Sequence, residues 1–152
     1  MSMKSSFIWM NGELVEFEKA TIHFLTPALH YGVGVFEGIR SYATSYGPAV
    51  FRLHEHMQRL VNSCKVLGFR DFPYTVEELD QAVLLTVGAN GFEECYIRPL
   101  VYLTDGGWNL TVDGGKPGVG IAVWEWAITS AKKHWRTVSA PILPRSPATT
   151  PM

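Results

Sequence analysis

The chain has 152 residues, with 13 Lys+Arg against 14 Asp+Glu, a formal net charge of −1 and 47% hydrophobic residues. That length fits one compact domain that needs no disulfide or metal to be stable. The balanced charge argues against binding to nucleic acid or to an anionic membrane. Only 18% of the residues are charged, against about 25% in typical domains, so we expect apolar surface that another chain or domain covers.

The first part of the chain predicts two strand pairs. Apolar runs at residues 7–10 and 14–17 flank Asn11-Gly12, the dipeptide that favours a tight hairpin turn. Residues 35–42 and the run that begins at Ala49 are typical of a second strand pair, joined by a turn.

Two helices follow in the predicted order. Apolar residues recur at helical spacing over residues 53–67, and Gly68 stands where such a helix would end. Thr75 and Glu78 form a capping-box signature that opens a second helix, which Asn90-Gly91 ends.

Two long strands are predicted at residues 95–103 and 119–126, on either side of a glycine-rich loop that holds Gly106, Gly107, Gly114 and Gly115. Trp124 and Trp126 share one face of the later strand, where we expect ordinary core filling. The order of elements predicts an α+β fold, a two-layer sandwich of a mostly antiparallel sheet with helices on one side. The proline-rich end of the chain, after a strand-like segment at 135–138, is typical either of a disordered tail or of a loop inside a longer protein.

The cysteines and the N-terminus indicate a cytoplasmic protein. Cys64 and Cys95 lie in apolar surroundings without metal-ligand spacing, which favours reduced core thiols. The N-terminus lacks the apolar run of a signal peptide, and nothing in the sequence is typical of a membrane span. The histidines show no HxH or HExxH spacing and no glycine-rich loop matches a nucleotide-binding motif, so we expect no metal.

Two sets of polar residues could carry chemistry. On the first helix, Arg52, His56, Arg59 and Ser63 share one stripe, which is either a solvated basic face or an anion site built on the planar fork of arginine. On the strands, alternation groups Arg40 with Phe36, Gly38 and Tyr42, and Arg98 with Tyr96, Leu100 and Tyr102. Either arginine could clamp a carboxylate beside an apolar wall or simply lie over the core.

Three motifs, HYGVGVFEGIRSY from His30, FRLHEHMQRL from Phe51 and YIRPLVY from Tyr96, resemble the branched-chain amino-acid aminotransferases. These are class IV, pyridoxal 5'-phosphate-dependent enzymes of fold type IV, and the resemblance covers residues 7–126. It implies transamination between branched-chain L-amino acids (Leu, Ile or Val) and 2-oxoglutarate in a cytoplasmic homodimer or higher homo-oligomer. It also implies a small N-terminal domain at 1–126, an interdomain linker at 127–133 and the start of the large cofactor-binding domain at 134–152.

The resemblance assigns roles to individual residues. Arg59 matches the arginine that grips the cofactor phosphate, and Arg98 matches the one that receives the distal carboxylate of glutamate. The remaining substrate-binding positions are Phe36, Gly38, Tyr96 and Trp126 in the apolar wall, Arg40 as the polar partner of Arg98, and Tyr31, Trp108 and Leu110 reaching into the neighbouring subunit. No catalytic residue is expected within the chain, because the Schiff-base lysine is expected just after Met152.

The chain departs from the family pattern near its C-terminal end. Thr129 stands where the family often has Tyr, residues 127–135 form a shorter segment than usual, and none of the lysines lies in the Schiff-base motif. The chain alone is therefore expected to be inactive. Two alternatives stay open: a non-catalytic truncated binding or dimerisation module, and a D-amino-acid or (R)-amine transaminase of the same fold.

Overall fold

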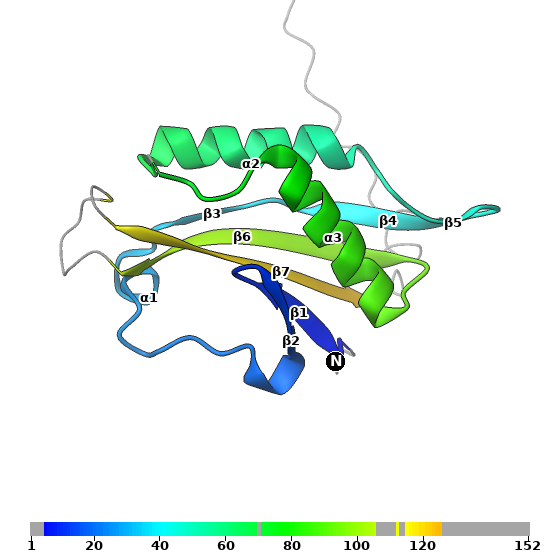
Figure 1. Ribbon diagram of the computed structural model, residues 1–152, viewed down its shortest axis with the longest axis horizontal. Coiled ribbons are helices and arrows are strands. Elements are labelled where there is room, and N and C mark those ends of the chain that lie inside the picture. Colours follow the sequence, from blue (N-terminus) through cyan, green and yellow to red (C-terminus); the bar gives the residue numbers. More distant parts are fainter. Residues whose placement is uncertain (1–4, 70, 106–111, 113–114, 126–152) are drawn as a thin grey trace, which may run out of the picture.

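The computed structural model describes residues 5–69, 71–105, 112 and 115–125. Within these residues the chain forms a seven-stranded sheet in the order β2-β1-β7-β6-β4-β5, with β3 also pairing with β6 (Figure 1). Every strand pair is antiparallel. The α+β fold predicted from the sequence is therefore confirmed.

The elements follow the predicted order. They are β1 (Phe7–Met10), β2 (Glu13–Glu16), the 3₁₀ turn η1 (Phe17–Lys19), α1 (Pro27–Tyr31), β3 (Gly34–Phe36), β4 (Ile39–Thr44), β5 (Gly47–Val50), α2 (Leu53–Leu67), α3 (Val76–Asn90), β6 (Cys95–Asp105) and β7 (Lys116–Glu125).

The local signals at turns and helix ends are confirmed. Asn11 and Gly12 both have positive φ, 50° and 109°, as a tight hairpin turn requires. Thr75 and Glu78 form the complete capping box, because each side chain accepts a hydrogen bond from the other's backbone N–H. Gly68 ends α2 in the left-handed conformation with φ 104°.

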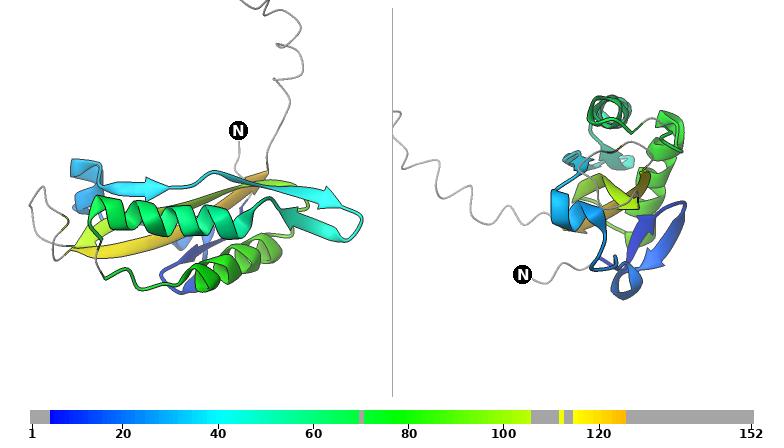
Figure 2. Two further views of the ribbon diagram at one scale, coloured as in Figure 1. Left: turned by 90° about the horizontal axis from the view of Figure 1, so that it is seen from above. Right: turned by 90° about the vertical axis from the view of Figure 1, so that its left-hand side faces the viewer.

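Helices α2 and α3 cover one face of the sheet, as Figures 1 and 2 show. The core between them is built from fully buried side chains of both layers: Met57, Leu60, Leu79 and Val83 from the helices and Ile97, Val101, Ile121 and Val123 from the sheet. Cys64 and Cys95 are free thiols in this core, and burial raises their pKa values to about 12 and about 11. Both thiols therefore stay protonated, and their burial as free cysteines agrees with the core thiols predicted from the sequence.

The sequence predicted one continuous strand at residues 35–42. This prediction was wrong, because the strand is interrupted between Phe36 and Ile39. Its two parts, β3 and β4, keep one register against β6: Phe36 pairs with Leu100 and Ile39 pairs with Ile97. Between these pairs lies Pro99, which has no backbone N–H to donate and only accepts a bond from the N–H of Glu37. The ladder therefore loses a bond at this point without changing its alternation of faces.

Other differences concern element lengths. The sequence pattern did not predict α1, which at five residues is too short to show helical periodicity. β6 continues two residues past the predicted end at 103, and β7 begins three residues before the predicted start at 119. No helix in the described part of the chain is long and apolar enough to cross a membrane.

Candidate functional site

The segment that joins β3 to β4 presents side chains to both faces of the sheet. Glu37 is 6% exposed and lies on the side of α2. Phe36 and Gly38 share the opposite face, because a strand alternates its side chains and the register is unbroken. Three consecutive residues, Phe36, Glu37 and Gly38, therefore contribute to two groups of side chains on opposite faces of the sheet.

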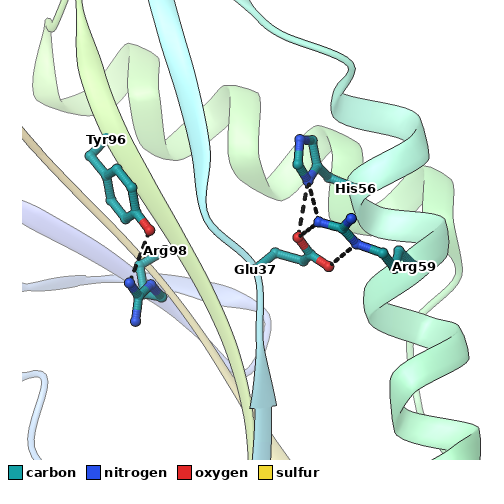
Figure 3. A network of polar contacts seen from close by, with 5 residues as sticks. All are labelled: Glu37, His56, Arg59, Tyr96 and Arg98. Carbon is teal, nitrogen blue, oxygen red and sulfur yellow. Dashed lines mark hydrogen bonds and ion pairs between the residues drawn. The ribbon is translucent and has the colours of Figure 1, made fainter. Parts of the chain in front are cut away.

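On the helix side, Glu37 binds two residues of α2 (Figure 3). Its carboxylate accepts hydrogen bonds of 2.6 Å from Nε and from a terminal nitrogen of Arg59. Nδ1 of His56 lies 3.0 Å from Oε2 of the same carboxylate. This is the bidentate fork in which a planar guanidinium matches a carboxylate.

Charge in this cluster is stabilised by its geometry. The hydrogen bonds from Arg59 lower the pKa of Glu37, assisted by His56 and opposed by the burial of the carboxyl group. Glu37 in turn raises the pKa of Arg59. Although Glu37 is buried, the side chain of Arg59 is 65% exposed. A guanidinium has five N–H donors, so the two bonds to Glu37 leave donors that fit a phosphate oxygen at the exposed end.

The basic stripe predicted on α2 divides into two parts. His56 and Arg59 turn toward Glu37, whereas Arg52 forms an exposed ion pair with Glu55 at 2.9 Å. Arg52 also begins the helix with a left-handed backbone, φ 48°. The solvated-face interpretation thus describes Arg52, whereas Arg59 combines a buried ion-pair partner with an exposed guanidinium.

On the opposite face, Arg98 is held between aromatic side chains. Its Cζ lies 4.3 Å from the ring centroid of Phe36 and 5.3 Å from that of Tyr96. A terminal nitrogen of Arg98 donates to the hydroxyl of Tyr96 at 2.9 Å (Figure 3). Its Nε is buried and has no hydrogen-bond partner among the described residues. The guanidinium is therefore oriented while part of its donor capacity is unused.

Tyr96 is fixed by its neighbours on adjacent strands. On one side, its ring stacks on Trp124, with centroids 4.8 Å apart and planes tilted by 36°. On the other side it lies against Gly38, where an added Cβ would overlap its hydroxyl oxygen and lie 3.2 Å from its Cζ. Arg40 pairs with Tyr96 across β4 and β6. The Tyr96 ring can therefore occupy this position only because Gly38 has no side chain.

An apolar cavity of about 520 Å³ lies on this same face of the sheet. Phe36 and Arg98 line it together with Leu100, Tyr102 and Ala122. The wall away from the sheet comes from the segment at 20–34, including Leu29 of α1. The cavity combines a largely apolar lining with one guanidinium, and pockets that bind small molecules commonly have this composition.

Exposed apolar side chains lie in α1, which contributes Leu29 to the cavity lining, and just before it in the chain. Phe24 is 76% exposed, Leu25 51% and Leu29 57%. Tyr31 ends α1 close by, yet it is not among the residues that line the cavity. Part of the apolar surface expected from the composition thus lies around α1, while other exposed apolar side chains, such as Val66 and Leu85, lie on α2 and α3.

Four of the predicted site residues come together. Phe36, Gly38, Tyr96 and Arg98 form one cluster, and Arg59 lies across the β3–β4 segment from it. Trp108, Leu110 and Trp126, as well as the linker and the segment at 134–152, lie outside the described residues. The groups that alternation predicted around Arg40 and Arg98 share one face, because the register holds across Pro99.

Glu37 and Trp124 were not predicted as functional residues. The sequence did contain a signal for Glu37: it is a carboxylate in the middle of an apolar strand. Alternation turns this position toward the helix, and a buried carboxylate needs a partner. Trp124 was expected to fill the core, and only the register of β6 against β7 shows that it stacks on Tyr96.

Comparison with known proteins finds branched-chain-amino-acid aminotransferases among the relatives. Residues 34–150 match the family described as amino-transferase class IV. The branched-chain-amino-acid aminotransferase of Pseudomonas aeruginosa is 43% identical over 126 residues, which cover 83% of this chain and 41% of that protein. The corresponding enzyme of Escherichia coli K12 is 42% identical over 124 residues, covering 81% and 40%. The chain therefore spans about two fifths of the length of the curated relatives it matches.

Solved structures agree in fold. A branched-chain amino acid aminotransferase from T.th., complexed with N-(5'-phosphopyridoxyl)-L-glutamate, superposes with a TM-score of 0.77 at 44% identity, covering 82% of this chain and 42% of that one. The Escherichia coli enzyme superposes with a TM-score of 0.78 at 41% identity, covering 85% and 43%.

Proposed function

Because the chain belongs to the class IV aminotransferase family, we propose that it forms the small domain of a pyridoxal 5'-phosphate-dependent branched-chain amino-acid aminotransferase. The reaction exchanges the amino group between branched-chain L-amino acids and 2-oxoglutarate. The proposal places the Schiff-base lysine just after Met152. It also assigns residues 127–133 to the interdomain linker and residues 134–152 to the start of the large domain.

Arg59 is the residue proposed to hold the cofactor phosphate. The support is its exposed guanidinium, which Glu37 anchors from behind and which keeps donors for a further oxygen ligand. When bound, pyridoxal 5'-phosphate supplies the electron sink that allows an amino group to move between an amino acid and a 2-oxo acid. The described residues contribute binding and orientation to this chemistry.

The observation that carries the substrate assignment is the position of Arg98 within an apolar cavity, against the ring of Phe36. An aliphatic side chain can be accommodated by Phe36 and the apolar lining, while a distal carboxylate can bind Arg98. Such a site explains how one cavity serves both a branched-chain amino acid and glutamate. Gly38, Arg40, Tyr96 and Trp126 complete the proposed wall.

We further propose that two copies of the chain assemble through the face that carries α1. The support is the exposed apolar surface of Phe24, Leu25 and Leu29 beside the cavity. In this arrangement Tyr31, Trp108 and Leu110 reach the neighbouring subunit's cavity. A cytoplasmic location also belongs to the proposal, supported by two free thiols in the core.

The test is a substrate panel with the complete enzyme that carries this chain. L-Leucine and 2-oxoglutarate should be converted to glutamate and a branched 2-oxo acid, and D-alanine and (R)-amines should not react. Turnover of the D-alanine or (R)-amine substrates in preference to L-leucine would move the assignment to the alternative transaminases. Failure to bind cofactor or to react with any of them would favour a binding or dimerisation module.

A further inference from the structure

A continuous row of side chains crosses the face of the sheet that carries the cavity. It begins at Trp124 of β7, whose ring stacks on Tyr96 of β6 at a centroid distance of 4.8 Å. The hydroxyl of Tyr96 accepts a 2.9 Å bond from Arg98, and Arg98 in turn lies over Phe36 at 4.3 Å. Trp124 is thus linked to the guanidinium through one intermediate ring.

We propose that Trp124 is a positioning residue for substrate selection, holding Tyr96 so that Arg98 is oriented to receive the distal carboxylate of a dicarboxylic substrate. This inference rests on the proposed function, because it gives Arg98 the role stated there. It adds a residue that is not among those lining the cavity and that is linked to the guanidinium through Tyr96.

The physical argument begins with the confinement of Tyr96. Gly38 bounds the ring on one side, where there is no room for a Cβ, and Trp124 bounds it on the other. A close aromatic pair contributes beyond its buried area, by an amount that corresponds to about two- to tenfold in an equilibrium constant. Without Trp124, the Tyr96 ring gains freedom on that side, and its hydroxyl no longer has a fixed place.

Arg98 depends on that hydroxyl more than on any other polar group. The bond to Tyr96 is its one hydrogen bond within the described residues, and its Nε has no partner there. An arginine side chain that nothing orients loses rotamer entropy when it binds a carboxylate. Loss of the Tyr96 contact therefore makes the carboxylate-bearing substrate bind less well.

A branched aliphatic side chain shares this dependence only in part. Tyr96 is one member of its proposed wall, whereas Phe36 and the residues that line the cavity, which do not include Trp124, make up the rest. Removal of the indole ring should consequently change the ratio of the two substrates. If Trp124 only filled space, its loss would affect both substrates alike.

The experiment uses the complete enzyme that carries this chain, with Trp124→Leu, the conservative Trp124→Phe, and Tyr42→Leu as the matched control. Tyr42 is an aromatic residue on the same sheet face, two positions beyond Arg40 on β4 and without a described contact to Tyr96 or Arg98. The readouts are KM for glutamate and leucine, and the dissociation constants of glutarate and 4-methylvalerate, which lack an amino group and only bind.

Trp124→Leu should raise KM for glutamate and the dissociation constant of glutarate by about two- to tenfold, the range that corresponds to loss of a contact of this size. Leucine and 4-methylvalerate should change less than about twofold, below the effect of a single weak contact. Trp124→Phe should restore values close to wild type, and Tyr42→Leu should leave all four unchanged. Should Trp124→Leu not fold, Trp124→Met tests the same loss of the ring with most of the volume kept.

A double-mutant cycle separates this inference from the proposed function. On an Arg98→Ala background, Trp124→Leu should cause no further glutamate-selective loss. Equal losses for glutamate and leucine, or an additional loss on that background, would overturn the positioning role. If Arg98→Ala itself weakens both substrates equally, the proposed function of Arg98 fails, and this inference fails with it.

Discussion

Glu37 accepts two 2.6 Å hydrogen bonds from the guanidinium of Arg59, across the space between the β3–β4 segment and α2. The carboxylate is nearly buried while the guanidinium is mostly exposed. A buried carboxylate needs such partners, because an unpaired charge would be expensive to remove from water. In this pair, Glu37 is part of the buried interior of the fold, and Arg59 presents a cation at the surface.

Replacing Glu37 by Gln should change the pH dependence of stability. The pKa of Glu37 is lowered in the folded state, from a reference value of 4.5. Its contribution is therefore present above that value and is lost as the pH falls through the folded-state pKa. Urea unfolding at pH 7, 5, 4 and 3 should show a difference between wild type and Glu37→Gln that narrows in acid. Glu55→Gln, at an exposed pair, is the control and should show a smaller difference. A difference that stays constant with pH would contradict the argument.

Arg59→Ala should weaken cofactor binding in the complete enzyme. Hydrogen bonds to a charged group contribute about 1.5–3 kcal/mol, which corresponds to a loss of about 10- to 150-fold for pyridoxal 5'-phosphate. Pyridoxal, which has no phosphate, should bind the variant and the wild type alike. Fluorescence titration of the apoenzyme measures both, with Arg52→Ala as the control on the same helix. Equal weakening of both ligands would contradict the phosphate assignment.

Arg98→Ala should reduce glutamate use far more than leucine use. The variant removes the cation that faces a distal carboxylate but leaves the apolar lining of the cavity. A loss of about 1.5–3 kcal/mol in kcat/KM is expected for glutamate, with leucine close to wild type. Steady-state kinetics with both amino donors provide the measurement. Equal losses would count against the role of Arg98 in carboxylate recognition.

Gly38→Ala should disturb the same selectivity through Tyr96. The added methyl group would overlap the tyrosine hydroxyl, so the ring must move away from its contact with Arg98. We expect a higher KM for glutamate with a folded protein. The control is Gly88→Ala on α3, where nothing lies within 4 Å of the new Cβ, and which should be neutral or stabilising by about 0.5–1 kcal/mol. Unchanged glutamate kinetics in Gly38→Ala would show that Tyr96 has more room than the structure indicates.

Thr75→Ala should lower the free energy of unfolding by about 1 kcal/mol, because the N–H of Glu78 loses its acceptor at the start of α3. Chemical denaturation of the chain at neutral pH measures this loss. Thr75→Ser, which keeps the hydroxyl, should retain most of the stability. A serine variant as unstable as the alanine variant would indicate that the methyl group, rather than the cap, matters.

Features that depend on neighbouring residues could be predicted from the sequence. The Asn11-Gly12 turn, the Thr75 capping box and the end of α2 at Gly68 each arise from backbone chemistry within a few residues. The grouping of Arg98 with Tyr96 follows from alternation along one strand and needs no knowledge of its partners. These parts of the fold and of the site were therefore predicted correctly.

Features that depend on pairing between distant segments could not be predicted in this way. Glu37 meets Arg59 only because α2 packs over the β3–β4 segment, and alternation on its own drew attention to the opposite face. Similarly, the contact of Trp124 with Tyr96 depends on the register of β7 against β6. Proline at 99 was a local sign of the gap between β3 and β4, but its effect falls on a different strand.

The missing ladder bond opposite Pro99 leaves the parity of the β3–β4 segment intact, and this limits how the segment can evolve. Loss or gain of a single codon between Phe36 and Ile39 would exchange the two sides for every later residue of the strand. Glu37 would then turn from α2, and Ile39 would leave the core. Point substitution is therefore the tolerated route of change in this stretch, and length variation among homologues should concentrate elsewhere.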